Sequence, residues 1–230
     1  MTSPFSYAWG ELHKVSRTKY LQRTRAAFER WELTEHASRV LVGAVLTLVT
    51  IRLGADFVRT LRLTSLLLLM SEGLVVLLTV VRRRAVVVDR SWDARLVTAI
   101  SLAGAPLLNP AATTSLLPDG VAAGISAVGL LVIVAGKLCL GRSLGLVPAN
   151  RGIVCKGIYR LIRHPIYAGY AITHVAFLLT HFDLWNVCVL VTSDVATVLR
   201  ALYEERTLVR DPEYVSYQSR VRWRLVPGVF

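Results

Sequence analysis

The chain has 230 residues, of which 54% are hydrophobic and 18% are charged, and its formal net charge is +12. This composition is too apolar for an ordinary soluble domain, and the hydrophobic residues occur in long runs that are typical of a helical membrane protein. Lys and Arg cluster between these runs, as they do in cytoplasmic loops of membrane proteins, so the charge does not indicate a nucleic-acid-binding protein. We expect anionic lipid headgroups to be its partners.

The N-terminal segment, residues 1–37, precedes the first long hydrophobic run and is rich in basic residues from residue 13 to residue 36. Its large hydrophobic residues recur at roughly helical spacing, which predicts an amphipathic helix that lies in the membrane interface. A solvated or self-associating helix would show the same pattern. We assign the rest of the chain, residues 38–230, to one transmembrane domain.

That domain contains six hydrophobic segments, so the predicted fold class is all-α, a polytopic membrane protein with about six transmembrane helices. The segments span about 38–58, 62–81, 95–117, 121–140, 165–179 and 184–202. The basic stretch Arg82-Arg83-Arg84 and the connector 141–164 then lie on the cytoplasmic side, together with both ends of the chain.

Two features inside these segments are unusual for a membrane span. Glu72 is an isolated carboxylate in the second segment; it marks either a functional site or an ion pair with Arg52 of the preceding segment. Small residues punctuate the fourth segment and predict close contact with another helix. These residues are Gly120, Gly124, Gly129 and Gly136.

The connector 141–164 is too long for a simple helix hairpin, and it leads into Pro165. Proline is favoured at the first position of a helix and disfavours a helical conformation in the residue before it. A helix is therefore predicted to begin at Pro165, with His164 just outside it and Tyr167 in its first turn. The N-terminus of such a helix favours a carboxylate or a phosphate.

Two adjacent carboxylates, Glu204 and Glu205, follow the sixth segment. Successive helix residues point about 100° apart, so the two cannot both face one ligand. Arg200 is four residues before Glu204 and is a possible ion-pair partner for it. The sequence alone does not choose between the two acids.

The histidines do not predict a metal centre. His174 and His181 share a helix face but lie about 10.5 Å apart along the helix axis, which is too far to bind one metal ion. We therefore expect no metal site in this chain.

Four blocks of the C-terminal half carry a resemblance to a known family. They are Gly157-x-Tyr159, Arg163-His164-Pro165-x-Tyr167-x-Gly169, Tyr203-Glu204-Glu205, and Tyr214-x-x-Tyr217-x-x-x-Val221 with Pro227. In this order they resemble the membrane-embedded methyltransferases, which include isoprenylcysteine carboxyl methyltransferases and phospholipid N-methyltransferases. The resemblance covers about residues 136–230, the predicted catalytic core. The Gly-x-Gly element of phospholipid methyltransferases is missing from residues 121–140, and Gly141-Arg142-Ser143 stands in its place.

The resemblance implies an integral membrane methyltransferase that depends on S-adenosylmethionine and whose C-terminal half encloses the cofactor on the cytoplasmic side. The acceptor would be a lipid or lipid-like molecule, either an isoprenylcysteine-type carboxylate that is O-methylated or a phospholipid amine that is N-methylated. The cofactor-binding residues that it implies are Tyr159, Arg163, His164, Tyr167, Gly169, Glu204 and Glu205. It also implies Glu205 and Arg163 as catalytic residues, and Arg142, Tyr217 and Arg220 as substrate-binding residues.

Two other functions fit part of the pattern. A membrane reductase of the related sterol reductase fold would use NADPH, and the basic connector would hold its phosphate. A non-catalytic membrane scaffold would keep the four blocks only for packing. The Tyr203-Glu204-Glu205 block fits the methyltransferases better than the reductases, and a scaffold has no need of Arg163-His164 before a helix together with two distant acids.

Overall fold

The computed structural model describes residues 44, 47–89, 91–109, 111–112 and 114–230. The predicted interfacial segment, residues 1–37, and the first part of the first predicted span lie outside the described residues. Residues from Leu46 to Phe230 form one compact unit.

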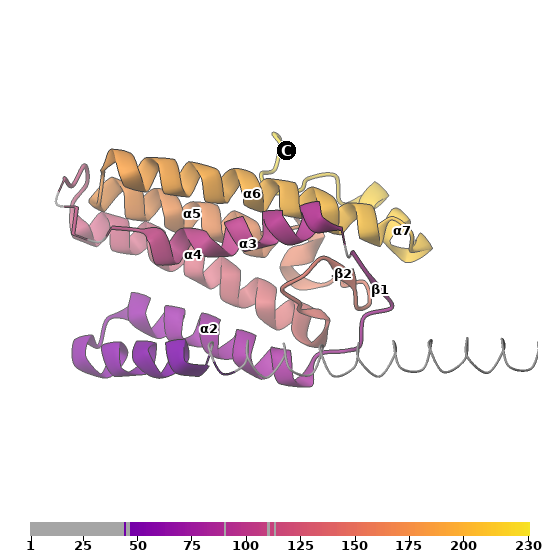
Figure 1. Cartoon of the computed structure of the whole chain (residues 1–230), viewed down its shortest axis with the longest axis horizontal. Helices are drawn as coiled ribbons and strands as arrows, with labels where there is room; N and C mark the ends of the chain where they lie inside the picture. The colour runs from indigo at the N-terminus through magenta and orange to yellow at the C-terminus, as the bar shows by residue number, and fades with distance from the viewer. Residues whose placement is uncertain (1–43, 45–46, 90, 110, 113) are drawn as a thin grey trace, which may run out of the picture. The chain divides into compact units, whose positions relative to one another are not determined.

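The regular secondary structure of the described part of this unit is almost entirely helical, which confirms the all-α class (Figure 1). Residues 47–60 form a helix. The helices after it are α2 (Leu63–Val81), α3 (Trp92–Leu107), α4 (Asp119–Leu140), α5 (Pro165–Thr180), α6 (Leu184–Leu208) and α7 (Pro212–Arg220). Two 3-10 turns, η1 (Gly141–Ser143) and η2 (Gly157–Arg160), lie in the connector between α4 and α5.

One short antiparallel ribbon joins the two long connections of the domain. Strand β1 (Val87–Val88), which follows α2, pairs with strand β2 (Ala149–Asn150) of the connector. Figure 1 shows this ribbon and α7 at the same end of the helices. The ribbon therefore lies where the polar blocks of the sequence converge.

Among the described helices, three are long and apolar enough to cross a membrane, namely Leu63–Val81, Asp119–Ser143 and Leu184–Leu208. Helix α5, Pro165–Thr180, is apolar but shorter. These helices and the family resemblance indicate an integral membrane protein. Six crossings remain a prediction.

The third predicted span, 95–117, was too long, because α3 ends at Leu107, directly after Pro106. The chain beyond it is held by a side chain of α6 instead of by helical hydrogen bonds. The N–H of Asn109 donates to Oδ1 of Asn186 (2.8 Å), and Nδ2 of Asn186 donates to the carbonyl oxygen of Asn109 (3.0 Å). Asn186 is fully buried, so this pair satisfies backbone groups that would otherwise lack partners.

Helices α4 and α5 approach each other at glycines, as the sequence predicted for Gly129 and Gly136. A Cβ atom at Gly136 would lie 2.7 Å from Cγ1 of Ile166, and one at Gly129 would lie 2.9 Å from the carbonyl oxygen of Gly169. Gly120 and Gly124 make no such contact with the described residues, because a Cβ atom at either would have none of their atoms within 4 Å.

The isolated carboxylate of α2 pairs with α4. Glu72 forms an ion pair with Lys137 (3.3 Å), whereas Arg52 was the partner considered from the sequence. The Lys137 ammonium also donates to the backbone oxygen and the hydroxyl of Ser71 (3.1 and 2.8 Å), so each of its three hydrogens has an acceptor. This network stabilises a fully buried charge in an apolar helix and fastens α2 to α4.

Gly169→Ala is expected to destabilise the α4–α5 contact. A Cβ atom there would lie 2.8 Å from the Gly129 carbonyl oxygen, and a backbone atom cannot move aside. Overpacking of this kind costs about 1–3 kcal/mol, so the apparent unfolding temperature in detergent should fall. Gly124→Ala is the matched control and should leave that temperature unchanged or raise it slightly, because alanine favours helix. Equal effects of both variants would contradict the packing described above.

Candidate active site

The helix start at Pro165 occurs where the sequence predicted it. His164 caps α5 in a non-helical conformation (φ −127°, ψ 62°), and Tyr167 lies in the first turn. The backbone of this cap is bound by the C-terminal tail. The N–H groups of Arg163 and His164 donate to the carbonyl oxygens of Trp223 (2.9 Å) and Arg224 (2.8 Å).

A buried carboxylate draws the side chains of this region together. Oε1 of Glu205 lies 2.8 Å from an Arg163 guanidinium nitrogen and 3.1 Å from Nε2 of His164. Its other oxygen, Oε2, accepts from Nε of Arg224 at 3.0 Å. The Glu205 side chain is only 6% exposed, so its charge is neutralised by these neighbours and not by water.

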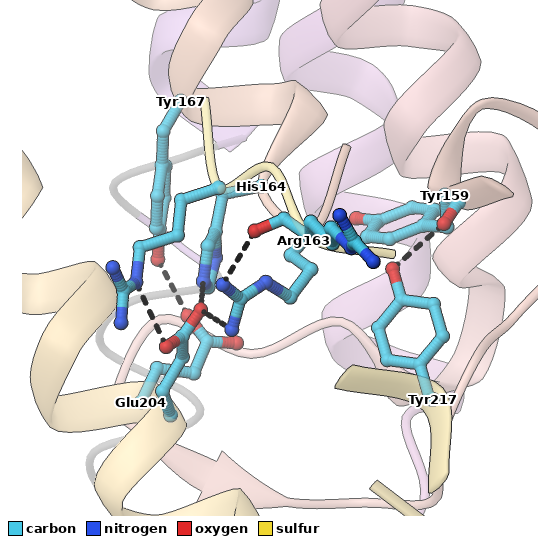
Figure 2. Close-up of polar contacts among 9 residues, drawn as sticks. Tyr159, Arg163, His164, Tyr167, Glu204 and Tyr217 are labelled. Atoms are coloured by element: carbon cyan, nitrogen blue, oxygen red, sulfur yellow. Dashed lines mark hydrogen bonds and ion pairs between the residues drawn. The ribbon is translucent and has the colours of Figure 1, made fainter. Parts of the chain in front are cut away.

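The neighbouring acid, Glu204, has a different environment. It accepts a hydrogen bond from the hydroxyl of Tyr167 (2.8 Å), and Figure 2 shows this contact beside the ring of His164. The rings of His164 and Tyr167 are stacked, with centroids 5.4 Å apart and an interplanar angle of 6°. The two carboxylates thus point in different directions, as the 100° step between successive helix residues requires.

Arg200 does not pair with Glu204, although the two are four residues apart on α6. Its guanidinium lies 5.4 Å from the ring centroid of Tyr167 and donates to the carbonyl oxygen of Leu146. Within the described part of the chain, its buried Nε has no hydrogen-bond partner. The same holds for Nε of Arg163.

These residues surround a cavity of about 110 Å³ between α4, the connector, α5, α6 and α7. Its charged lining consists of four cations and one carboxylate, namely Lys137, Arg151, Arg163, Arg200 and Glu204. Val75 of α2 and Leu102 of α3 contribute to its apolar lining. Lys137 and Arg163 are paired with Glu72 and Glu205, which do not line the cavity, and the guanidinium groups of the lining can bind an anionic group of a ligand.

Helix α7 closes one side of the cavity with Tyr214 and Tyr217. The hydroxyl of Tyr217 donates to the carbonyl oxygen of Tyr159 (2.7 Å), as Figure 2 shows. Burial raises the pKa of both α7 tyrosines above the ordinary value, so their hydroxyls keep their protons even in moderately alkaline solution. Nδ2 of Asn150 on β2 donates to the carboxylate of Asp211, the N-cap residue of α7 (2.8 Å).

The structure brings most of the predicted residues to the cavity, but not all of them. Six of them line it, namely Tyr159, Arg163, His164, Tyr167, Glu204 and Tyr217. Glu205 lies behind Arg163 and His164 and is not part of the lining. Gly169 lies at the α4–α5 contact, where a Cβ atom would be 2.6 Å from Ile133.

The two arginines predicted to bind substrate also lie outside the cavity lining. Nε of Arg142 donates to the carbonyl oxygen of Val81 (2.9 Å), and Nε of Arg220 donates to that of Ser216 (3.2 Å). The first arginine follows the end of α4, and the second is an exposed residue of α7. Neither position supports the predicted contact with a substrate in this cavity.

Three cations of the cavity were missed in the sequence. Lys137 was detectable, because a lone basic residue in a hydrophobic segment is as unusual as Glu72. Arg200 was noticed only as a partner for Glu204. Arg151 was one of several basic residues in the connector, and no sequence pattern separates it from the others.

Comparison with known proteins agrees with the sequence blocks. Residues 130–215 match the model of the Isoprenylcysteine carboxyl methyltransferase (ICMT) family. This match confirms the predicted family. It includes the second half of α4, the connector, α5, α6 and the start of α7, which supply most of the polar lining of the cavity. The match supports a membrane methyltransferase. No curated protein matches the chain.

Within the ICMT-like segment, Glu205→Ala is expected to destabilise the protein more than Glu204→Ala. Removal of Glu205 leaves Arg163 buried without its carboxylate, and loss of one partner of a buried ion pair costs about 3–5 kcal/mol. Glu204→Ala removes only the hydrogen bond with Tyr167, which is worth at most about 3 kcal/mol. The apparent unfolding temperatures of the two purified variants test this order. The reverse order would show that Glu205 does not hold the site together.

Proposed function

We propose that the protein uses S-adenosylmethionine to methylate a carboxylate of a lipid or lipid-like acceptor. The observation that carries this proposal is the cavity with four cations and one carboxylate, which is built largely by the ICMT-like segment. The cavity adjoins helices that are apolar enough to lie in a membrane. A polar cofactor and an anionic group of a membrane lipid can therefore both reach this cavity.

The residues fit the amino-acid end of this cofactor. A zwitterion requires donors for its carboxylate and acceptors for its ammonium group. The Nε atoms of Arg163 and Arg200 are buried donors without a hydrogen-bond partner in the part of the chain that the structure describes, and such donors cost free energy until an acceptor binds them. We assign Arg163 to the cofactor carboxylate, and Glu204 to the ammonium group or the ribose hydroxyls.

When bound, S-adenosylmethionine supplies a methyl group on a positively charged sulfur. The protein has to hold the acceptor oxygen in line with that methyl group and to exclude water. A carboxylate is already ionised near neutral pH, so no residue has to remove a proton from it. Binding and orientation by this chain are sufficient for such a transfer.

The lining of the cavity favours a carboxylate acceptor over an amine. A protonated amine has no lone pair and would have to lose its proton before it reacts, whereas an ionised carboxylate can pair with a guanidinium group of the lining as it is. We assign the acceptor carboxylate to Arg200, which lines the cavity and whose buried Nε has no hydrogen-bond partner among the described residues. Val75 and Leu102, from two helices outside the matched segment, provide apolar surface for the rest of the acceptor.

A reductase that uses NADPH is the second candidate. Its phosphate would also suit a cavity with Arg151, Arg163 and Arg200 in its wall. The match to the ICMT family favours the methyltransferase.

Calorimetric titration of the detergent-purified protein should show binding of S-adenosylhomocysteine and no binding of NADPH. The product analogue carries the same amino-acid end and adenosine as the methyl donor, and it does not react. Binding of NADPH alone would move the protein to the reductase class.

Methyl transfer should produce an ester. With a radiolabelled methyl donor and a prenylated cysteine derivative as acceptor, the label should enter the organic phase and be released as methanol by mild alkali. A phospholipid with a primary amine headgroup is the parallel acceptor. Alkali-stable label on that lipid would overturn the choice of a carboxylate.

Arg200→Gln should lower kcat/KM for the acceptor about 10–100-fold, because a hydrogen bond to a charged group is worth about 1.5–3 kcal/mol. The affinity for S-adenosylhomocysteine should change little. Arg206→Gln is the matched control, since Arg206 is an exposed residue of the same helix, and it should behave like the wild type. A loss of cofactor affinity with unchanged acceptor KM would reassign Arg200 to the cofactor.

A further inference from the structure

We infer that Glu205 is a positioning residue that sets which ring nitrogen of His164 carries the proton. Nδ1 of His164 is thereby kept as a hydrogen-bond acceptor that faces the cavity, where it binds the ammonium group of the methyl donor. The choice of ligand rests on the proposed function, whereas the state of the ring follows from contacts within the protein.

The contacts of Glu205 determine the role of Nε2. An ionised carboxylate can only accept hydrogen bonds, and Glu205 is held between the guanidinium groups of Arg163 (2.8 Å) and Arg224 (3.0 Å), which favour its ionised form. Nε2 of His164 lies 3.1 Å from the same carboxylate and must therefore be a donor. In a neutral imidazole, a proton on Nε2 leaves Nδ1 with a free lone pair.

Nδ1 is available to a ligand. No described residue forms a hydrogen bond with it, and His164 is part of the cavity lining. The ring cannot turn over freely, because it is stacked on Tyr167 with an interplanar angle of 6° and a flip would break the contact between Nε2 and Glu205.

A second acceptor lies on the same side of the cavity. Glu204 is bound to the hydroxyl of Tyr167, the ring on which His164 is stacked, and Figure 2 shows the three side chains together. An ammonium group has three donors and can satisfy both Nδ1 of His164 and the Glu204 carboxylate. Glu204 is the one carboxylate among the described residues that line the cavity, so this is the part of the wall that suits an ammonium group.

Glu205 acts on the ligand only through His164, because it does not line the cavity. The arrangement uses the principle of the Asp that orients the His of a Ser-His-Asp triad, in which an amide in place of the carboxylate gives the wrong tautomer. An amide at position 205 can donate to Nε2 and so move the proton to Nδ1, which then repels an ammonium group.

Two isosteres of His164 separate the two ring nitrogens. His164→Asn places an amide oxygen near the position of Nδ1 but does not reach Glu205, whereas His164→Gln reaches Glu205 and leaves no acceptor at Nδ1. The probes are S-adenosylhomocysteine and its analogue without the α-amino group, titrated by calorimetry. We expect the wild type and the Asn variant to prefer the amino-bearing ligand. The Gln variant should bind that ligand at least tenfold more weakly and lose the preference.

An unchanged preference in the Gln variant would overturn the assignment of the ammonium group to Nδ1. Failure of the wild type to bind either ligand would instead count against the proposed function. Apparent unfolding temperatures of the variants show whether a loss of binding reflects a loss of folded protein.

Nitrogen NMR of the protein labelled at histidine shows, without any ligand, which ring nitrogen of His164 carries the proton. The His164 signals are identified because they are missing in His164→Gln. We expect the proton on Nε2 in the wild type and in Arg224→Ala, which removes a partner of Glu205 but leaves the acceptor of Nε2. Glu205→Gln should shift the proton toward Nδ1 and weaken binding of S-adenosylhomocysteine. A wild-type ring with its proton on Nδ1 would overturn the inference.

Discussion

One buried carboxylate holds the polar end of this protein together. Glu205, near the end of α6, contacts Arg163 and His164 before α5 and Arg224 of the C-terminal tail. These segments are distant in the sequence, and each brings a positive or polar group that would be costly to bury alone. Because they share one counter-charge, loss of Glu205 would leave Arg163 and Arg224 without this carboxylate and His164 without its hydrogen-bond partner. Glu205 thus supports the cavity wall from behind without lining it.

The chemistry of individual residues made much of the fold predictable from the sequence. The start of α5 followed from Pro165, and α2, α4 and α6 followed from long hydrophobic runs. The end of α3 was not predictable, because it depends on Asn186, which lies 77 residues beyond the Asn109 whose backbone it binds. The pairing of β1 with β2 is equally long-range, and two-residue strands leave no periodic pattern.

Many residues of the site were predictable from the sequence, but the direction in which their side chains point was not. Helix geometry showed that Glu204 and Glu205 diverge, but no local pattern specifies the tertiary contacts that hold Glu205 away from the cavity, with Arg163, His164 and Arg224. Local spacing was misleading for Arg200, since an i,i+4 relation permits an ion pair but does not require one. Tertiary contacts with Tyr167 and Leu146 decided its orientation instead. Gly169 belonged to a sequence block of the family, but its position shows a requirement of helix packing.

The excess of cations in the cavity has a consequence for the end of the proposed reaction. In that reaction a carboxylate would enter with a negative charge that Arg200 stabilises, and esterification would remove that charge. The product would then be a neutral, more apolar molecule beside a guanidinium that binds an ester less strongly than a carboxylate. Its transfer from the cavity to the hydrocarbon of the bilayer becomes favourable. The charged groups that bind the substrate would thus bind the product more weakly, which favours release of the product after methyl transfer.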